Sequence, residues 1–294
     1  MQAMILAAGF GTRLRPYSLL KPKPLFPVLN KPLLLATIAR LKNSGFTRII
    51  VNCHHLREQI VQAVGSLSGV IVQEEEQILG TGGGLREAYS NVNDDPLLVT
   101  NGDIYHTIDF AELYKYHSQS SNMVTMALHD FPRFNNVVIE GDRVTNFVDS
   151  NSTSSKLAFS GIQVINPSIL REIEPGKQSC IIEHYRSLLT KKIPIHFLKY
   201  DNAHWTDMGT PRDYLELHHS LLTGLTPCWP ELEYGGDTFL IDSEADHSTH
   251  AEMKDWACVG KARIEPGALL SRCVVWDGAV VKKGSVFSDA IVIP

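Results

Sequence analysis

The stretch that decides the fold is residues 7–28, which read AAGFGTRLRPYSLLKPKPLFPV. It follows a short apolar strand at residues 3–6 and is rich in Gly, Arg, Lys and Pro. Gly9 and Gly11 allow the backbone to turn sharply and to approach a ligand without a Cβ in the way. Successive backbone amides in such a turn form a concave anion site. The stretch therefore predicts a loop that holds the polyphosphate of a nucleotide.

Basic side chains follow the two glycines. Arg13 and Arg15 bring forked donors that suit phosphate oxygens, and Lys21 and Lys23 add point charges. Two familiar phosphate loops do not match, since Leu14 stands where a dinucleotide fingerprint has its third glycine and no Gly-Lys-Ser/Thr closes the motif. A plain glycine-rich turn with chance arginines is the alternative, but the density of basic residues favours a phosphate site.

Length, charge and cysteine usage limit the possible classes. The 294 residues suffice for one large domain with an appendage or for two domains. A net charge of −5 argues against general nucleic-acid binding, and no signal peptide or apolar membrane span is expected. The five cysteines are scattered and odd in number, which is typical of free thiols in a reducing cytosol. We therefore expect a cytoplasmic protein with no nucleic-acid or membrane partner.

Strand and helix patterns alternate after the opening loop. Residues 32–44 have helical spacing, 48–51 read as a buried strand, 56–64 as a helix and 70–72 as a strand. Such alternation predicts an α/β fold, with a Rossmann-like, mostly parallel sheet and helices on both faces. Ligands of such sheets bind beyond the carboxyl ends of the strands, where the opening loop begins. Further along, residues 136–140 and 143–147 predict a hairpin closed by Gly141-Asp142.

Two carboxylates in loops are candidate metal ligands. Asp103 follows the buried strand 96–100, and Mg²⁺ prefers one or two carboxylates together with phosphate oxygens. The alternative role, capping the next helix, fits Asp109 better. Asp207 lies in the loop before a helix that Thr210 caps and Pro211 starts. The alternative there is a solvated side chain beside a packed tryptophan.

Two segments carry less specific signals. Residues 73–84 combine an acidic run with four glycines in five residues, which predicts a loop that either lines a flat base or simply connects two elements. Because glycines are unsuited to a helix interior, we expect the next helix to begin after them. The pairs His54-His55 and His218-His219 are interpreted as helix-surface residues.

The C-terminal part changes character. We expect a catalytic domain at residues 1–224, a polar linker at 225–258 and a short repeat domain at 259–294. Small residues recur there with a loose six-residue rhythm, which is typical of a parallel β-helix, although an irregular β-rich tail is the alternative. About three coils fit this span, near the minimum for a stable array. The tail is therefore expected to pack on the main domain or on another subunit, and a homo-oligomer is possible.

Taken together, the motifs resemble those of the sugar-1-phosphate nucleotidylyltransferases, in particular the GDP-mannose pyrophosphorylase-like branch. The matching pieces span residues 3 to about 215 and occur in this order: AAGFGTRLRP, KPKPLFPV, EEEQILGTGG, NGD, FSGIQVI and WTDMGTP. The resemblance implies the nucleotide-diphospho-sugar transferase fold and a left-handed β-helix at the C-terminus. It also implies transfer of a nucleotidyl group from an NTP to a sugar-1-phosphate, with release of pyrophosphate.

The resemblance also implies residue roles. Arg13 would act on the β- and γ-phosphates and Lys23 on the phosphates during transfer, while Asp103 and Asp207 would hold Mg²⁺. The sugar phosphate would lie near Asp149, Lys156 and Gly161. The nucleotide-binding residues would be Ala7, Ala8, Gly9, Gly11, Thr12, Arg13, Glu75, Gly80, Thr81 and Gly102.

Two departures leave alternatives open. Where the family has Glu-Lys-Pro for the sugar phosphate, this chain has Asp149-Ser150-Asn151, so Asp149 would replace the Glu and Lys156 the Lys. A TGGG loop at residues 81–84 is similar to that of N-acetylmuramate-1-phosphate uridylyltransferases, so a uridylyl transfer remains an alternative to guanylyl transfer. A non-catalytic regulatory subunit is a further alternative, but it would be expected to lack the loop Arg, the Lys or the carboxylates.

Overall fold

The computed structural model describes residues 1–148 and 155–294, and these residues form two compact units. The first unit contains Met1–Phe10 and Thr37–Trp205, and the second contains Gly11–Ala36 and Thr206–Pro294. The expected boundary at residue 224 therefore does not separate them. The chain instead leaves the first unit within the opening loop and returns to the second unit near residue 206. Asp149 lies outside the described residues.

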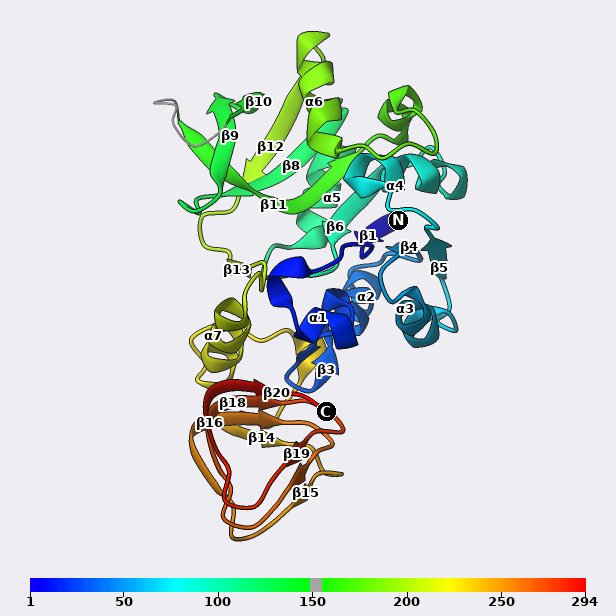
Figure 1. Ribbon diagram of the computed structural model, residues 1–294. Coiled ribbons are helices and arrows are strands. Elements are labelled where there is room, and N and C mark those ends of the chain that lie inside the picture. The colour runs from blue at the N-terminus through cyan, green and yellow to red at the C-terminus, as the bar shows by residue number, and fades with distance from the viewer. Residues whose placement is uncertain (149–154) are drawn as a thin grey trace. The chain divides into compact units, whose positions relative to one another are not determined.

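The first unit is built on a mixed sheet (Figure 1). Its strand order is β5-β4-β1-β6-β11-β8-β12-β10-β9 among the described residues. The strands are β1 (Gln2–Leu6), β4 (Arg48–Cys53), β5 (Val70–Glu74), β6 (Leu97–Asn101), β8 (Val124–His129), β9 (Asn135–Glu140), β10 (Arg143–Phe147), β11 (Lys156–Ile165) and β12 (Ile195–Lys199), and the short β7 (Tyr105–His106) lies outside this sheet.

Only part of this sheet is parallel, so the expectation of a mostly parallel sheet is corrected. β5, β4, β1 and β6 run parallel to one another, as the strand–helix alternation predicts. β11 then runs antiparallel to both β6 and β8, and β9 and β10 form the expected hairpin around Gly141 and Asp142. The two-residue turn accounts for the antiparallel β9–β10 pair, because strands joined by such a turn must run in opposite directions, while β12 pairs parallel with β8.

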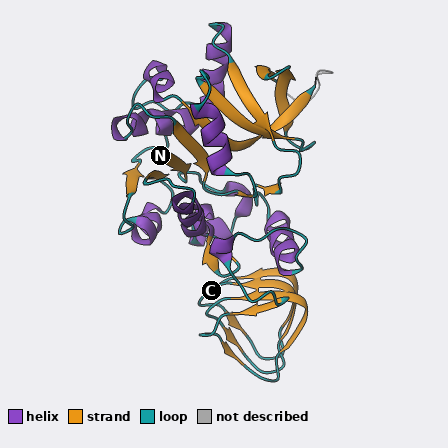
Figure 2. Cartoon of the chain, turned by 180° about the vertical axis from the view of Figure 1, so that it is seen from behind, coloured by secondary structure: helices purple, strands orange, loops and turns teal. Residues whose placement is uncertain are grey.

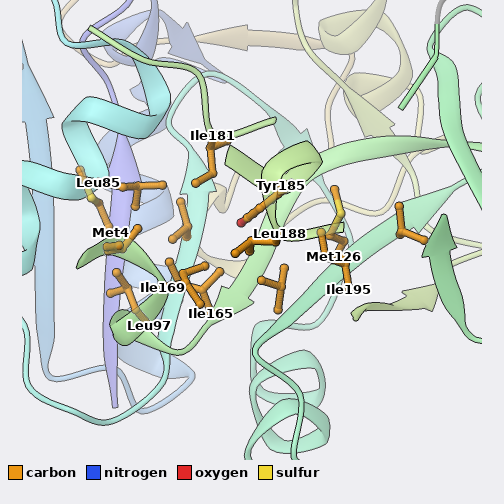
Figure 3. Close-up of a cluster of buried hydrophobic side chains, with 14 of the residues drawn as sticks. Met4, Leu85, Leu97, Met126, Ile165, Ile169, Ile181, Tyr185, Leu188 and Ile195 are labelled. Atoms are coloured by element: carbon orange, nitrogen blue, oxygen red, sulfur yellow. The ribbon is translucent and has the colours of Figure 1, made fainter. Parts of the chain in front are cut away.

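Both faces of the parallel half are buried. Successive side chains of a strand point to opposite faces, and Ala3, Met4 and Ile5 are all fully buried. Met4 belongs to a large cluster with side chains of α4 (Gly80–Ala88) and α6 (Ile181–Thr190), shown in Figure 3. The other helical segments are α3 (Arg57–Val64), α5 (Phe110–Ser118), η3 (Tyr89–Asn91) and η4 (Pro167–Glu172), and α2 (Leu33–Asn43) begins in the second unit and continues in the first.

The predicted N-terminal caps of two helices are confirmed. The Asp109 side chain accepts hydrogen bonds from the amides of Ala111 and Glu112 at the start of α5. Thr210 accepts one from the Asp213 amide at the start of α7 (Pro211–Leu222). The interpretation of His218 as a surface residue is wrong, because its side chain is fully buried within the second unit.

The second unit ends in parallel strands that form two sheets, visible as stacked strands in Figure 2. Leu269 pairs with Glu252 and Val286 with Leu269, so successive coils repeat at an interval of 17 residues. The core between the sheets consists of small and branched side chains such as Ala257, Ile264 and Val281. One sheet contains β14 (Phe239–Ile241), β16 (Glu252–Val259), β18 (Leu269–Val275) and β20 (Val286–Val292), and the other β15 (Asp246–His247), β17 (Arg263–Ile264) and β19 (Val280–Val281).

The expectation of a linker at residues 225–258 is therefore wrong. This segment contains η5 (Pro230–Leu232), β14, β15 and most of β16, so the coiled region begins before residue 259. Strands of two or three residues are too short to show a period in the sequence. The remaining short elements are η1 (Thr12–Leu14), α1 (Tyr17–Leu20), η2 (Lys23–Leu25), β2 (Pro27–Val28), β3 (Lys31–Pro32) and β13 (Trp205–Thr206).

Candidate active site

In the first unit, a buried polar network fixes the beginning of the opening loop. The Ala7 amide donates to Asn52 Oδ1 at 2.8 Å, and Asn52 Nδ2 donates to Glu75 Oε1 at 2.7 Å. Oε2 of the same carboxylate accepts from the Leu79 amide at 3.1 Å. Glu75 is only 3% exposed, so both of its oxygens serve the protein frame. The network connects the ends of β1, β4 and β5 to the start of α4.

The glycine-rich segment belongs to a helix. α4 begins at Gly80, which corrects the expectation of a helix starting after the glycines. A Cβ on Gly80 would lie 2.6 Å from the Ser179 carbonyl oxygen, and one on Gly83 would lie 2.5 Å from that of Lys177. The helix therefore uses glycines because the segment before α6 passes against its first turn. Thr81 Oγ1 accepts from the Ile181 amide at 3.0 Å and so caps α6.

The end of β6 and the middle of β11 bring two motifs together in the first unit. Gly161 has a φ of +79°, and a Cβ there would lie 2.5 Å from Asn101 Nδ2. Gly102 donates its amide to the Leu6 carbonyl oxygen at 2.8 Å, which fixes the start of the NGD loop against β1. The carboxylate of Asp103 follows directly and is half-buried. Asn101, Gly102 and Gly161 therefore form one strand edge, with Asp103 at the next position.

In the second unit, the rest of the opening loop meets the part of the WTDMGTP segment that begins at Thr206. Gly11 has a φ of +59° and leads into η1, which places Arg13 on an exposed turn. Arg13 Nη2 lies 3.1 Å from Asp207 Oδ2, and Lys23 Nζ donates to the main-chain carbonyl oxygen of Asp207. Two basic residues from the opening loop therefore converge on a single acidic residue.

The short segment that carries Lys23 is followed by aromatic packing that the sequence did not indicate. Lys23 is 5% exposed, and the fully buried Phe26 follows it by three residues. The Phe26 ring lies 4.8 Å from the ring of Trp276 and 5.8 Å from that of Tyr214, both edge to face. Trp276 Nε1 donates to the Tyr214 hydroxyl at 3.2 Å. The position of the loop lysine thus depends on α7 and on the coiled region.

The donor set is compatible with Mg²⁺. Among the described residues, no group of three or more acidic, histidine or cysteine side chains could hold a metal ion by itself. Mg²⁺ commonly binds one or two carboxylates and takes its remaining ligands from phosphates and water. Asp103 and Asp207 are carboxylates in loops, with Asp103 in the first unit and Asp207 in the second. Either one fits a metal that arrives with a triphosphate.

The other expected residues are placed as follows. Ala7 and Ala8 are buried, whereas Gly9 and Thr12 are exposed in the opening loop. A Cβ on Gly9 would meet no atom within 4 Å, so its backbone is open to a ligand. Lys156 is the first residue of β11, opposite Val138. The residues that the sequence did not reveal are neighbours of the expected ones, namely the buried Asn52, Phe26, Tyr214 and Trp276 and the half-buried Ser179.

Comparison with known families identifies the chain's class. The model of a family described as nucleotidyl transferase matches residues 2–224. The chain belongs to this nucleotidyl transferase family. It is 30% identical to the mannose-1-phosphate guanylyltransferase of Mycobacterium tuberculosis, over 97% of this chain and 82% of the relative. It is 28% identical to mannose-1-phosphate guanylyltransferase 1 of Arabidopsis thaliana, over 99% of this chain and 86% of the relative.

Solved structures of family-like folds agree with the α/β architecture. HddC from Yersinia pseudotuberculosis in complex with GMP-PN superposes with a TM-score of 0.63 at 24% identity, covering 75% of this chain and 99% of that one. The inositol-1-phosphate CTP transferase from T. maritima superposes with a TM-score of 0.62 at 17% identity, covering 77% of this chain and 98% of that one.

Across residues 1–148 and 155–294, no helix is both long and apolar enough to cross a bilayer.

Proposed function

We propose that the enzyme transfers a guanylyl group from GTP to mannose-1-phosphate and releases pyrophosphate. The observation that carries the proposed chemistry is the convergence of Arg13 and Lys23 on Asp207. The choice of GTP and mannose-1-phosphate is supported by the names of relatives that match nearly the whole chain. Free cysteines among the described residues support action in a reducing cytoplasm.

In the proposed mechanism, an oxygen of the sugar phosphate attacks the α-phosphorus of the NTP and the bond to the pyrophosphate breaks. Lys23 would stabilise charge on the phosphate under attack, and Arg13 would receive the leaving pyrophosphate. Asp103 and Asp207 would hold Mg²⁺, which supplies positive charge to the phosphate oxygens. Catalysis would then depend on positioning and charge neutralisation without a covalent intermediate.

Substrate-binding parts of the chain follow from the same proposal. Gly9, Gly11 and Thr12 would line the triphosphate, and Gly80 and Thr81 the base. Gly161 would allow the sugar to approach β11, with Lys156 and Asp149 near its phosphate. We also infer that the coiled region is a left-handed β-helix, which a 17-residue coil supports because it is close to three six-residue repeats.

A pyrophosphate-release screen tests the proposal. GTP, UTP, CTP, ATP and dTTP are each paired with mannose-1-phosphate, glucose-1-phosphate and N-acetylmuramate-1-phosphate in the presence of Mg²⁺. We expect the highest kcat/KM with GTP and mannose-1-phosphate, and a loss of at least ~100-fold in Asp103→Asn. A preference for UTP and N-acetylmuramate-1-phosphate would establish the uridylyl alternative. Absence of turnover with every pair would favour a regulatory subunit.

A further inference from the structure

Two residues that are expected to bind different ligands hold each other in the second unit. Arg13 is expected at the triphosphate and Asp207 at the metal ion, yet Arg13 Nη2 lies 3.1 Å from Asp207 Oδ2. The Arg13 side chain is 58% exposed and that of Asp207 16% exposed, so a ligand can reach the pair. Because Mg²⁺ requires close oxygen ligands in near-octahedral geometry, a metal at this carboxylate would compete with the guanidinium for it.

The Asp207 residue has holds on it besides Arg13. The Gly209 amide donates to Asp207 Oδ1 at 3.1 Å, and Lys23 donates to the main-chain carbonyl oxygen of Asp207. Gly209 leaves room for the pair in this arrangement, since a Cβ would lie 2.5 Å from Asp207 Oδ2 and 2.6 Å from Arg13 Nη1. The turn therefore presents a carboxylate with further hydrogen bonds, and Arg13, on an exposed turn, is the more exposed partner.

We propose that Arg13 and a divalent cation compete for the Asp207 carboxylate, so that metal binding releases Arg13 to the triphosphate; this rests on the proposed nucleotidyl transfer. The guanidinium is permanently charged, so without metal it returns to the carboxylate. By linkage, a triphosphate that attracts Arg13 would in turn make Asp207 available to the metal. The pair thus couples metal and nucleotide binding through the protein, in addition to the direct bond between metal and phosphate.

The coupling predicts that Asp207→Asn, the loss of a proposed metal ligand, tightens GTP binding when metal is absent. Asn keeps an oxygen for the Gly209 amide but weakens the hold on Arg13, because the bond loses its charge assistance. Metal-free GTP binding, measured by calorimetry with a chelator present, is expected to become about two- to fivefold tighter than in the wild type. Adding Mg²⁺ is expected to increase the GTP affinity of the same variant less than it increases that of the wild type.

A second pair of variants separates this coupling from simple charge removal. Losing any negative charge near an anionic ligand also tightens binding, with or without Arg13. In an Arg13→Gln background, Asp207→Asn should therefore give no further gain if the effect acts through Arg13. Inorganic tripolyphosphate, titrated in parallel, should show the same pattern without a base. Asp289→Asn, which removes a carboxylate paired with Arg272 in the same unit, is the matched control and should leave GTP affinity unchanged.

The outcomes distinguish the inference from the proposed function. Unchanged or weaker metal-free GTP binding in Asp207→Asn would overturn the competition, as would a gain that persists in the Arg13→Gln background. Failure of the wild type to bind GTP with Mg²⁺ and to release pyrophosphate would instead overturn the proposed function. Thermal unfolding of each variant establishes that it is folded before its affinity is compared.

Discussion

Glu75→Gln tests whether this residue supports the loop frame or contacts the nucleotide base. Its Oε1 accepts from Asn52 Nδ2 at 2.7 Å and its Oε2 from the Leu79 amide at 3.1 Å. Glutamine offers one oxygen and one NH₂ group, so either orientation sets the NH₂ against a buried donor. One stranded donor costs about 1–3 kcal/mol and the loss of charge from the remaining bond about 1 kcal/mol, so unfolding free energy should fall by about 2–4 kcal/mol.

Urea unfolding of the wild type and the variant measures this loss. Glu76→Gln is a matched control, because Glu76 is the exposed neighbour on the same acidic run, and it should change stability by less than about 0.5 kcal/mol. The Ala7 amide depends on Asn52, so Glu75→Gln should also raise the KM for GTP. Both effects follow from the loss of one buried network.

A different pattern would refute this reasoning. If Glu75 acts by contacting the base, as the motif resemblance implies, the glutamine variant should raise the KM for GTP while unfolding like the wild type. An unfolding free energy of Glu75→Gln within about 0.5 kcal/mol of the wild type would therefore show that Glu75 does not support the loop frame. A base contact would further predict that the size of the KM effect differs between GTP and UTP, whereas a loosened frame should affect both.

Three other changes have defined outcomes. Gly161→Ala sets a methyl group 2.5 Å from Asn101 Nδ2 at a φ of +79°, so it should cost about 2–3 kcal/mol in urea unfolding and lower kcat. Lys23→Ala should lose at least ~100-fold in kcat for pyrophosphate release, and near-normal turnover would contradict its role. Burial lowers the pKa of His218 from 6.5 to about 4, and its Nε2 accepts from the Leu29 amide, so the folded protein holds this side chain neutral. The free energy of unfolding should therefore have its full value above pH 6.5 and fall by up to about 3 kcal/mol as the pH approaches 4. Unfolding measured across this range should show the slope, and His218→Gln should flatten it.

The parallel half of the sheet, two helix starts and the β9–β10 hairpin could be predicted from the sequence because their signals are local. Apolar strands, helical spacing, the caps Asp109 and Thr210 and the two-residue turn at Gly141 each depend on a few neighbouring residues. The antiparallel insertion of β11 between β6 and β8 has no such signal. It depends on pairings between residues far apart in the chain, which no local pattern reports.

The site residues themselves were accessible to sequence reasoning, but their partners were not. Glycines and charges in a loop point to a ligand, and Arg13, Lys23 and Asp207 lie together in the second unit as the motifs suggest. Asn52 stands one residue beyond the strand expected at 48–51 and looks like an ordinary strand end. Its importance appears only when Ala7 and Glu75 are seen on either side of it.

The coiled region contributes to the packing of the segment that carries Lys23. Phe26 is fully buried, and Trp276 contributes a close edge-to-face contact to it. Removing Trp276 would expose part of a ring whose burial is worth about 1.5–3 kcal/mol, and Lys23 lies one short turn away on η2. Lys23 Nζ donates to the main-chain carbonyl of Asp207, so its position depends on the backbone of η2 and on that of the Asp207 loop. The coils therefore stabilise the same segment that the proposed chemistry requires to be rigid, which explains why Gly11–Ala36 belongs to their unit.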